Sequence, residues 1–286
     1  MSHSFVIYSS DRAPSIALIA ALGEALGSSR MSERGHRIAW TQLIEPTAEI
    51  KVLALGLCAK FNTDGAWLRD GLKLSDFALL AMDMDSTVIT IECIDEMADY
   101  CGKKAEVSAI TEATMRGEIA DFDTSLRKRV ALLKGLSIKA LDAVYYDRLR
   151  LSRGAKQLID SAHVQGLKTL LVSGGFTYYT SRVQKQLGIT WARANELEII
   201  DDLLSGALVG DIVNAQTKAI EVKARCFELG VAPSKAIAVG DGANDMKMMA
   251  VAGLSVAYHA KPILHARTNA AIHFGGLETL SEWLSP

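Results

Sequence analysis

The most informative stretch of the chain is Phe77-Ala78-Leu79-Leu80-Ala81-Met82-Asp83-Met84-Asp85-Ser86-Thr87, a continuous apolar run that ends abruptly in two carboxylates. Such a run, without polar alternation, is typical of a strand that is buried on both faces of a parallel sheet. In these sheets ligands bind beyond the carboxyl ends of the strands. The stretch therefore predicts an α/β fold with a polar site where this strand ends.

Further apolar runs follow, and two of them also end in polar motifs. Leu167–Val172 leads into Ser173-Gly174-Gly175, Ala236–Val239 leads into Gly240-Asp241-Gly242, and Leu254–Ala257 comes after them. Helical stretches separate the runs, which is the pattern of a parallel sheet with helices on both faces. The polar motifs are therefore expected to lie together at one edge of one sheet.

The rest of the chain has a different character. Between Ile91 and Arg150 the strand pattern stops and helix-forming residues dominate, so a helical cap is predicted at about residues 91–150. Residues 1–72 carry no dense set of catalytic residue types and are predicted to form a small α+β domain, with residues 73–286 forming the larger one. The elements expected in residues 1–72 are strands at Phe5–Tyr8, His36–Leu43 and Ile50–Leu57, a helix at Ala13–Leu26 and a polar loop at Gly27–Gly35.

The composition restricts the classes of function. The chain has 286 residues, of which 49% are hydrophobic, and it can therefore bury a substantial core. A net charge of −2, from 31 basic and 33 acidic residues, argues against a nucleic-acid partner. Neither a secretory signal nor an apolar stretch of roughly 18 residues occurs, so a cytoplasmic protein without a membrane partner is expected. The four cysteines form no zinc-like cluster and are expected to be reduced: Cys58, Cys93, Cys101 and Cys226.

Asp83 and Asp85 lie two residues apart, directly after the first predicted strand. Two carboxylates this close are costly unless a cation neutralises them. One could attack a phosphorus atom while the other moves protons, and a metal could hold the phosphoryl oxygens. The alternative is a solvated turn whose acids cap a helix.

The later motifs supply further groups of this kind. Asp241 and Asp245 suit an oxygen-ligated Mg²⁺ site together with Asp83, whereas the bidentate Glu of a calcium-binding EF-hand is absent. The glycines after Ser173 would let backbone N–H groups approach an anion, although an ordinary strand-to-helix turn has the same composition. Lys218, early in a helical stretch, either stabilises negative charge in the site or is a surface lysine.

In this order the motifs resemble those of the haloacid dehalogenase-like phosphatase superfamily, namely DxDxT, a strand ending in Ser-Gly, a lysine and GDGxxD. The resemblance covers about Leu74 to the C-terminus. Within the superfamily the chain resembles the phosphoserine phosphatases through Glu92, Ser125–Val130 and Ser173–Phe176. This implies a Rossmann-like parallel sheet with an inserted helical cap, and a Mg²⁺ cofactor. It also implies that a small-molecule substrate, O-phospho-L-serine, is hydrolysed through an aspartyl-phosphate, the last step of L-serine biosynthesis.

The resemblance also implies roles for single residues. Asp83 would be the nucleophile, Asp85 the general acid and then the base, and Lys218 a bridge between nucleophile and phosphoryl group. Asp83, the backbone carbonyl of Asp85 and Asp241 would bind Mg²⁺, with Asp245 supporting them. The remaining implied contacts are Ser173, Gly174 and Asn244 to the phosphate, Glu92 to the ammonium, Arg129 to the carboxylate, and Met115 and Phe122 along the closed pocket.

Several alternatives remain open at this point. Another phosphatase of the superfamily would keep the core motifs and change Glu92 and Arg129, and a phosphotransferase could pass phosphate from Asp83 to another acceptor. A dehalogenase would lack Asp85, and a P-type pump would need membrane spans. A non-catalytic amino-acid sensor would not need the full set of catalytic residue types. Residues 1–72 loosely resemble small regulatory domains, including the ACT type. A dimerisation role leading to a homodimer, or mere stabilisation of the chain, is at least equally open.

Overall fold

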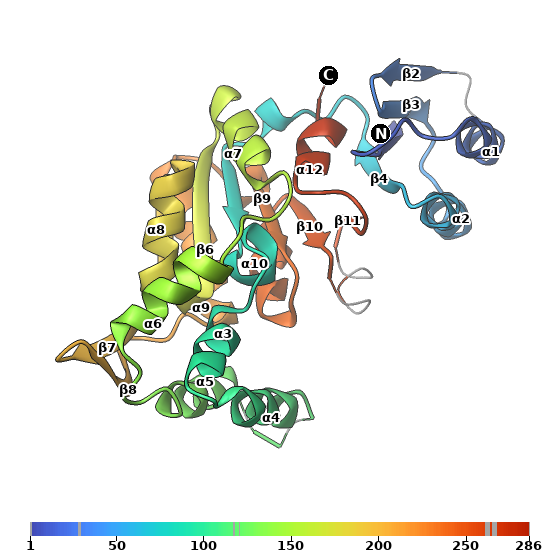
Figure 1. Cartoon of the computed structure of the whole chain (residues 1–286). Helices are drawn as coiled ribbons and strands as arrows, with labels where there is room; N and C mark the ends of the chain where they lie inside the picture. Colours follow the sequence, from blue (N-terminus) through green and yellow to red (C-terminus); the bar gives the residue numbers. More distant parts are fainter. Residues whose placement is uncertain are drawn as a thin grey trace.

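The computed structural model describes residues 2–27, 30–116, 118–119, 121–260, 264 and 268–285, with the exception of the Met115 side chain. These residues form a four-stranded sheet near the N-terminus and a seven-stranded sheet in the larger part of the chain (Figure 1). Among them, no helix combines the length and the apolar character that crossing a membrane requires.

The N-terminal sheet is antiparallel, with the strand order β2-β3-β1-β4. Its strands are β1 (His3–Tyr8), β2 (Met31–Arg34), β3 (Arg37–Leu43) and β4 (Asp64–Arg69), and its helices are α1 (Ile16–Leu26) and α2 (Ala48–Lys60). Phe5 and Ile7 pack in one hydrophobic cluster with residues of both helices. Val6, which points to the opposite face, belongs to the hydrophobic core of the larger domain. Both faces of this sheet are therefore covered.

Two expectations for this region are wrong. Ile50–Leu57 is helical and lies within α2, whose first turn is capped by the Thr47 hydroxyl. Its helical period is hidden because apolar residues such as Val52 also occupy the exposed side. The expected loop at Gly27–Gly35 contains the edge strand β2, whose residues are all exposed and therefore lack an apolar alternation. The strands predicted at Phe5–Tyr8 and His36–Leu43 are confirmed by β1 and β3, and the helix predicted at Ala13–Leu26 by α1. Residues 28 and 29 lie outside the described residues.

The large sheet has the order β11-β10-β9-β5-β6-β7-β8. Its strands are β5 (Leu79–Met82), β6 (Lys168–Phe176), β7 (Trp191–Ile200), β8 (Leu203–Val209), β9 (Ala236–Gly240), β10 (Leu254–Tyr258) and β11 (Ala270–Ile272). All pairings are parallel except that of β7 with β8. In β5, Leu80 and Met82 belong to the core on one side of the sheet, and Leu79 and Ala81 to the core on the other. This confirms the predicted α/β fold with a sheet buried on both faces.

Helices cover both faces of the large sheet. Buried residues of α7 (Ala155–Val164), α8 (Thr177–Leu187) and α12 (Glu278–Trp283) belong to one core. Those of α9 (Ala215–Glu228) and α10 (Met246–Val251) belong to the other. The hairpin β7–β8 was not expected from the sequence.

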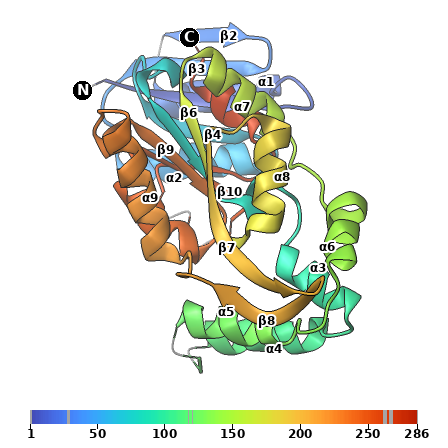
Figure 2. The same ribbon diagram turned by 90° about the vertical axis from the view of Figure 1, so that its left-hand side faces the viewer.

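Between β5 and β6 the described chain also contains the α-helices α3 (Cys93–Tyr100), α4 (Lys104–Met115), α5 (Phe122–Ala131) and α6 (Ile138–Ala143). Figures 1 and 2 show them at the end of the large sheet opposite to the N-terminal sheet, with β7 and β8 reaching toward them. The N–H of Gly135 donates to the carbonyl of Leu204 at 2.8 Å, which attaches this helical cap to β8. The domain boundary at residues 72 and 73 and the cap limits of about 91–150 stay predictions.

Candidate active site

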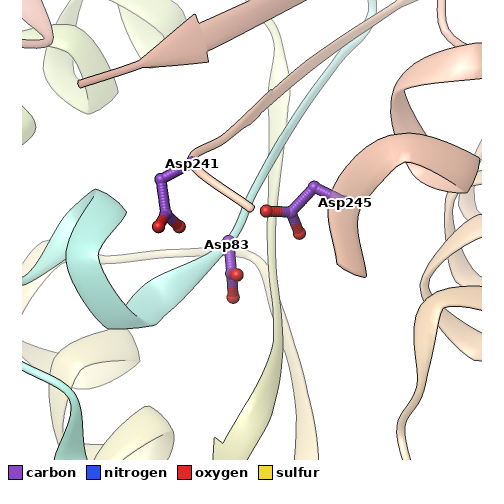
Figure 3. A group of neighbouring side chains, drawn as sticks. All are labelled: Asp83, Asp241 and Asp245. Carbon is purple, nitrogen blue, oxygen red and sulfur yellow. The ribbon is translucent and has the colours of Figure 1, made fainter. Parts of the chain in front are cut away.

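Three acidic side chains meet where β5 and β9 end. Asp83 follows β5, Asp241 follows β9, and Asp245 begins the turn into α10. Met82 and Val239 are paired across the two strands, so the residues that follow them leave the sheet side by side. One carboxylate oxygen from each acid lies within 4.8 Å of the others, and Figure 3 shows the three groups around a common space. The sheet therefore assembles the acids that the sequence motifs suggested.

Lys218, the lysine of the third motif, joins this group. It projects from α9, is fully buried, and places its Nζ 2.7 Å from Asp83 Oδ2 and 2.8 Å from Asp245 Oδ1. Burial alone would lower the pKa of Lys218, but the charges of Asp245 and Asp83 outweigh it and raise this pKa. The lysine is therefore held as an ammonium ion against the predicted nucleophile.

One lysine does not neutralise three carboxylates. Burial and the charge of Asp83 raise the pKa of Asp241 to about 6 and that of Asp245 to about 7. The Thr87 hydroxyl, which donates to Asp241 Oδ1 at 3.2 Å, offsets only part of this effect. An all-oxygen cluster that is short of positive charge matches the ligand preference of a hard divalent cation such as Mg²⁺. The residues present therefore fit the cofactor.

Asp85, two residues after Asp83, makes a different set of contacts. Its Oδ1 accepts from the N–H of Cys93, the first residue of α3, at 2.9 Å. Its Oδ2 accepts from the Ser173 hydroxyl at 3.1 Å. Burial and the neighbouring charge of Asp83 raise the pKa of Asp85. The left-handed backbone of Ser86, with φ of 53°, turns the chain beyond it. The surroundings of Asp85 thus stabilise the neutral form of its carboxyl group.

The two glycines after Ser173 leave little room for side chains. A Cβ on Gly175 would lie 2.4 Å from Asp85 Oδ2, and one on Gly174 would lie 3.0 Å from the ring of Phe122. Asn195 of β7, which no sequence motif indicated, donates through Nδ2 to the carbonyl of Gly174 at 2.8 Å and thereby holds this end of β6. A buried asparagine is unusual within a strand, but the strand itself had not been identified.

The cap and the core enclose a cavity of about 480 Å³. The predicted site residues that line it are Asp83, Asp85, Glu92, Phe122, Arg129, Gly174, Asp241 and Asn244. Ser173 is buried beneath the cavity lining, and the Met115 side chain lies outside the described residues. Asn244 donates through Nδ2 to Asp83 Oδ2 at 3.2 Å. The structure therefore gathers residues from the cap and from three strand ends around one space.

The cap contributes one acidic and one basic side chain. Glu92 opens to the cavity and accepts a hydrogen bond of 2.7 Å from the Ser86 hydroxyl. Desolvation by the surrounding protein and the charge of Asp85 nevertheless raise its pKa to about 8. Arg129 lies beside Phe122, and its buried Nε has no hydrogen-bond partner. Arg127, two residues earlier, is exposed. An unpartnered guanidinium donor at a cavity is suited to an anionic ligand group.

Known proteins resemble this chain over most of its length. The family model described as haloacid dehalogenase-like hydrolase matches residues 80–250. The phosphoserine phosphatase of Polaromonas sp. is 56% identical over 215 residues, which cover 74% of this chain and 91% of that protein. The phosphoserine phosphatase of Albidiferax ferrireducens is 51% identical over 219 residues, covering 75% and 92%.

Solved structures agree with these similarities. A probable phosphoserine phosphatase from Vibrio cholerae, in unliganded form, has a TM-score of 0.83 and 34% identity, covering 98% of this chain and 86% of that one. A HAD family hydrolase from Salmonella enterica serovar Typhi has a TM-score of 0.90 and 28% identity, covering 99% and 98%. A substrate-bound phosphoserine phosphatase complex has a TM-score of 0.68 and 33% identity, covering 73% and 99%.

Proposed function

The chain belongs to the haloacid dehalogenase-like hydrolase family, and from this premise we propose that it hydrolyses O-phospho-L-serine to L-serine and phosphate, the last step of L-serine biosynthesis. One observation carries the proposal. A single cavity has carboxylates in its core wall, with Lys218 buried against one of them, Asp83. Its cap wall holds an acid and an arginine, Glu92 and Arg129. Relatives that are 56% and 51% identical and named phosphoserine phosphatase support the same substrate.

Hydrolysis proceeds in two displacements at phosphorus. Asp83 attacks the phosphoryl group, the bond from phosphorus to the serine oxygen breaks, and Asp85 gives its proton to that oxygen. The raised pKa of Asp85 supports this first role, because the carboxyl can carry a proton into the reaction. Water then attacks the aspartyl-phosphate, Asp85 takes a proton from it, and the Asp83 carboxylate is regenerated.

The neighbouring groups stabilise charge and hold the phosphoryl group. Asp83, the Asp85 carbonyl and Asp241 would hold Mg²⁺, and Asp245 would support them through Lys218. When bound, Mg²⁺ supplies Lewis-acid stabilisation of the phosphoryl charge. The Lys218 ammonium lies within 2.7 Å of the Asp83 carboxylate, where negative charge shifts during attack. Ser173, Gly174 and Asn244 would bind the remaining phosphoryl oxygens.

The cap recognises the amino-acid part of the substrate. The carboxylate of phosphoserine would accept from Arg129, whose buried Nε lacks a partner. Its ammonium would pair with Glu92 and would lower the raised pKa of that carboxyl. Phe122 would line the closed pocket with Met115. A substrate without the amino and carboxylate groups would leave both charges unpaired, which is a strong basis for selectivity. A cytoplasmic homodimer stays a prediction from the sequence.

A substrate panel tests this function. Phosphate release from phosphoserine, with Mg²⁺, should exceed release from glycerol phosphate by at least about 100-fold in kcat/KM. EDTA and the Asp83→Asn variant should each abolish turnover, which separates the enzyme from a contaminating phosphatase. Equal turnover of the two substrates would remove the amino-acid assignment. Phosphate transfer that requires an added alcohol acceptor would indicate a phosphotransferase instead.

A further inference from the structure

A side-chain contact joins the cap to the core beside the cavity. Asn214, at the start of α9, donates through Nδ2 to the two carboxylate oxygens of Asp123 in α5, at 3.1 and 3.2 Å. Asp123 follows Phe122, which lines the cavity. The two residues are 91 positions apart in the chain, with Asp123 in the cap and Asn214 in the core. The contact therefore exists only while the cap rests on the core.

The helix that Asn214 caps fixes the orientation of its amide. Its Oδ1 accepts from the backbone N–H groups of Gln216 and Thr217 at 3.0 and 3.1 Å. The amide N–H groups must therefore point away from α9, where Asp123 accepts them. In the opposite orientation the amide NH₂ group of Asn214 would face two backbone N–H donors, and its amide oxygen would face the Asp123 carboxylate. The contact thus requires a donor on the core and an acceptor on the cap.

The same turn of chain supports the catalytic groups. The N–H of Lys218 donates to the carbonyl of Asn214 at 2.9 Å, so the lysine lies one helical turn beyond the capping residue. The N–H immediately before Asn214 donates to Asn195 Oδ1 at 2.7 Å, and Asn195 holds the Gly174 carbonyl at 2.8 Å. From the cap, Phe122 packs on Gly174. The position of α5 on the core is therefore linked both to Gly174 at the end of β6 and to Lys218.

We propose that Asp123 and Asn214 form a clasp that holds the cap closed over the cavity. By doing so, the clasp keeps the glycines at the end of β6 and Lys218 in the positions that hydrolysis requires. Both are positioning residues, because neither touches the reacting atoms. Closure of a cap excludes water and completes a catalytic site, so a weakened clasp lowers the fraction of productive complexes. The inference rests on the proposed function, since the clasp acts on a substrate enclosed between cap and core.

The variant Asn214→Asp separates the clasp from the helix cap. Aspartate is as good an N-cap as asparagine, so α9 keeps its start, but the clasp now opposes two carboxylates. We expect kcat/KM for phosphoserine to fall about tenfold, because a charge-assisted hydrogen bond is replaced by repulsion. The reversed pair, Asp123→Asn with Asn214→Asp, again has one donor and one acceptor. It should return kcat/KM to within about twofold of the wild type.

Control variants distinguish the loss of the clasp from a general loss of stability. Asp121→Asn replaces an aspartate by asparagine, as Asp123→Asn does, but at the N-cap of α5, two residues before Asp123. It should leave kcat/KM unchanged. If Asn214→Asp melts early, Asp123→Ala carries the test, since it leaves α9 capped and should lower kcat/KM about threefold. Wild-type kcat/KM in the single variants, or a reversed pair no better than Asn214→Asp, would overturn the clasp. A wild-type protein inactive on phosphoserine would instead overturn the proposed function.

Discussion

Asp241 and Asp245 are acids whose surroundings favour the protonated form until a cation arrives. Their pKa values of about 6 and about 7 result from burial and from the charge of Asp83. The proposed binding of Mg²⁺ would require Asp241 as a carboxylate, and the charge of the ion would also favour ionised Asp245. We therefore expect Mg²⁺ binding to release protons, and the apparent Mg²⁺ affinity to weaken about tenfold per pH unit below about pH 6 for each proton released.

Titration calorimetry of Mg²⁺ binding in two buffers of different ionisation enthalpy measures this proton release directly. The raised pKa values of Asp241 and Asp245 also predict how the stability depends on pH. Without Mg²⁺ the folded protein binds more protons than the unfolded chain between about pH 4 and pH 7, so these two groups lower stability as the pH rises. Asp211→Asn, which changes an exposed acid, is the control. Affinity and heat that are independent of pH and buffer would contradict the shifts.

At the residue scale the sequence predicted the groups that a strand-end motif carries. Asp83, Asp85 and Asp241 could be located because short spacings after an apolar run fix where they leave the sheet. Asn195 could not, because its contact with Gly174 depends on β6 and β7 being neighbours, and sequence spacing does not give that pairing. Thr87 belongs to the DxDxT motif, but its contact with Asp241 depends on the folded turn.

At the scale of elements, the end of β6 shows how closely the backbone approaches the catalytic acid. A Cβ on Gly175 would lie 2.4 Å from Asp85 Oδ2 and 3.0 Å from Ser173 Oγ. The variant Gly175→Ala must therefore displace Asp85, and displacements of this kind cost about 100-fold in turnover. We expect kcat to fall by that amount, as measured by phosphate release from phosphoserine at saturating Mg²⁺.

Gly56→Ala is the matched control, because Gly56 lies in α2 and a Cβ there meets nothing within 4 Å. Alanine in a helix interior is favoured over glycine by up to about 1 kcal/mol, so this variant should melt at a slightly higher temperature with unchanged kcat. If Gly175→Ala kept kcat within about threefold of the wild type, Asp85 would tolerate movement that the proposed proton transfers do not allow.

Elements were predictable where the pattern of burial along the chain is simple. The runs that became β5, β9 and β10 are buried on both faces, so their composition alone identified them. In contrast, α2 exposes apolar residues and β2 exposes every residue, so neither shows the alternation between solvent and core that a sequence pattern reports. The hairpin β7–β8 mixes polar and apolar residues because much of it lies beyond the core.

At the scale of the whole molecule, the N-terminal sheet is packed onto the core. Val6 and Leu68 share one hydrophobic cluster with Leu280 and Trp283 of α12. Yet in the described part of the chain, no residue before Asp83 lines the cavity. These residues thus support the fold from the end opposite to the cap, as Figure 2 also shows. Their contribution to the site is expected to pass through stability and not through substrate contact.

Asp64 is the residue on which this attachment can be tested. It is buried at the start of β4, and its carboxylate accepts from the backbone N–H groups of His273 at 2.7 Å, Phe274 at 3.2 Å and Gly275 at 2.6 Å. Asp64→Ala would leave these donors without their acceptor, at a cost of about 3 kcal/mol. We expect urea unfolding to show this loss of stability, while the KM for phosphoserine stays within about twofold of the wild type.

Glu33→Ala, in the exposed strand β2, changes an acid of the same sheet and should alter stability by less than about 0.5 kcal/mol. A loss below about 1 kcal/mol in Asp64→Ala would mean that the loop after β11 finds other acceptors, and that the apolar contacts alone hold the sheet in place. An increase in KM without a loss of stability would contradict the separation of roles. It would give the N-terminal sheet a direct influence on the cavity, transmitted through β11 and the strands between it and β5.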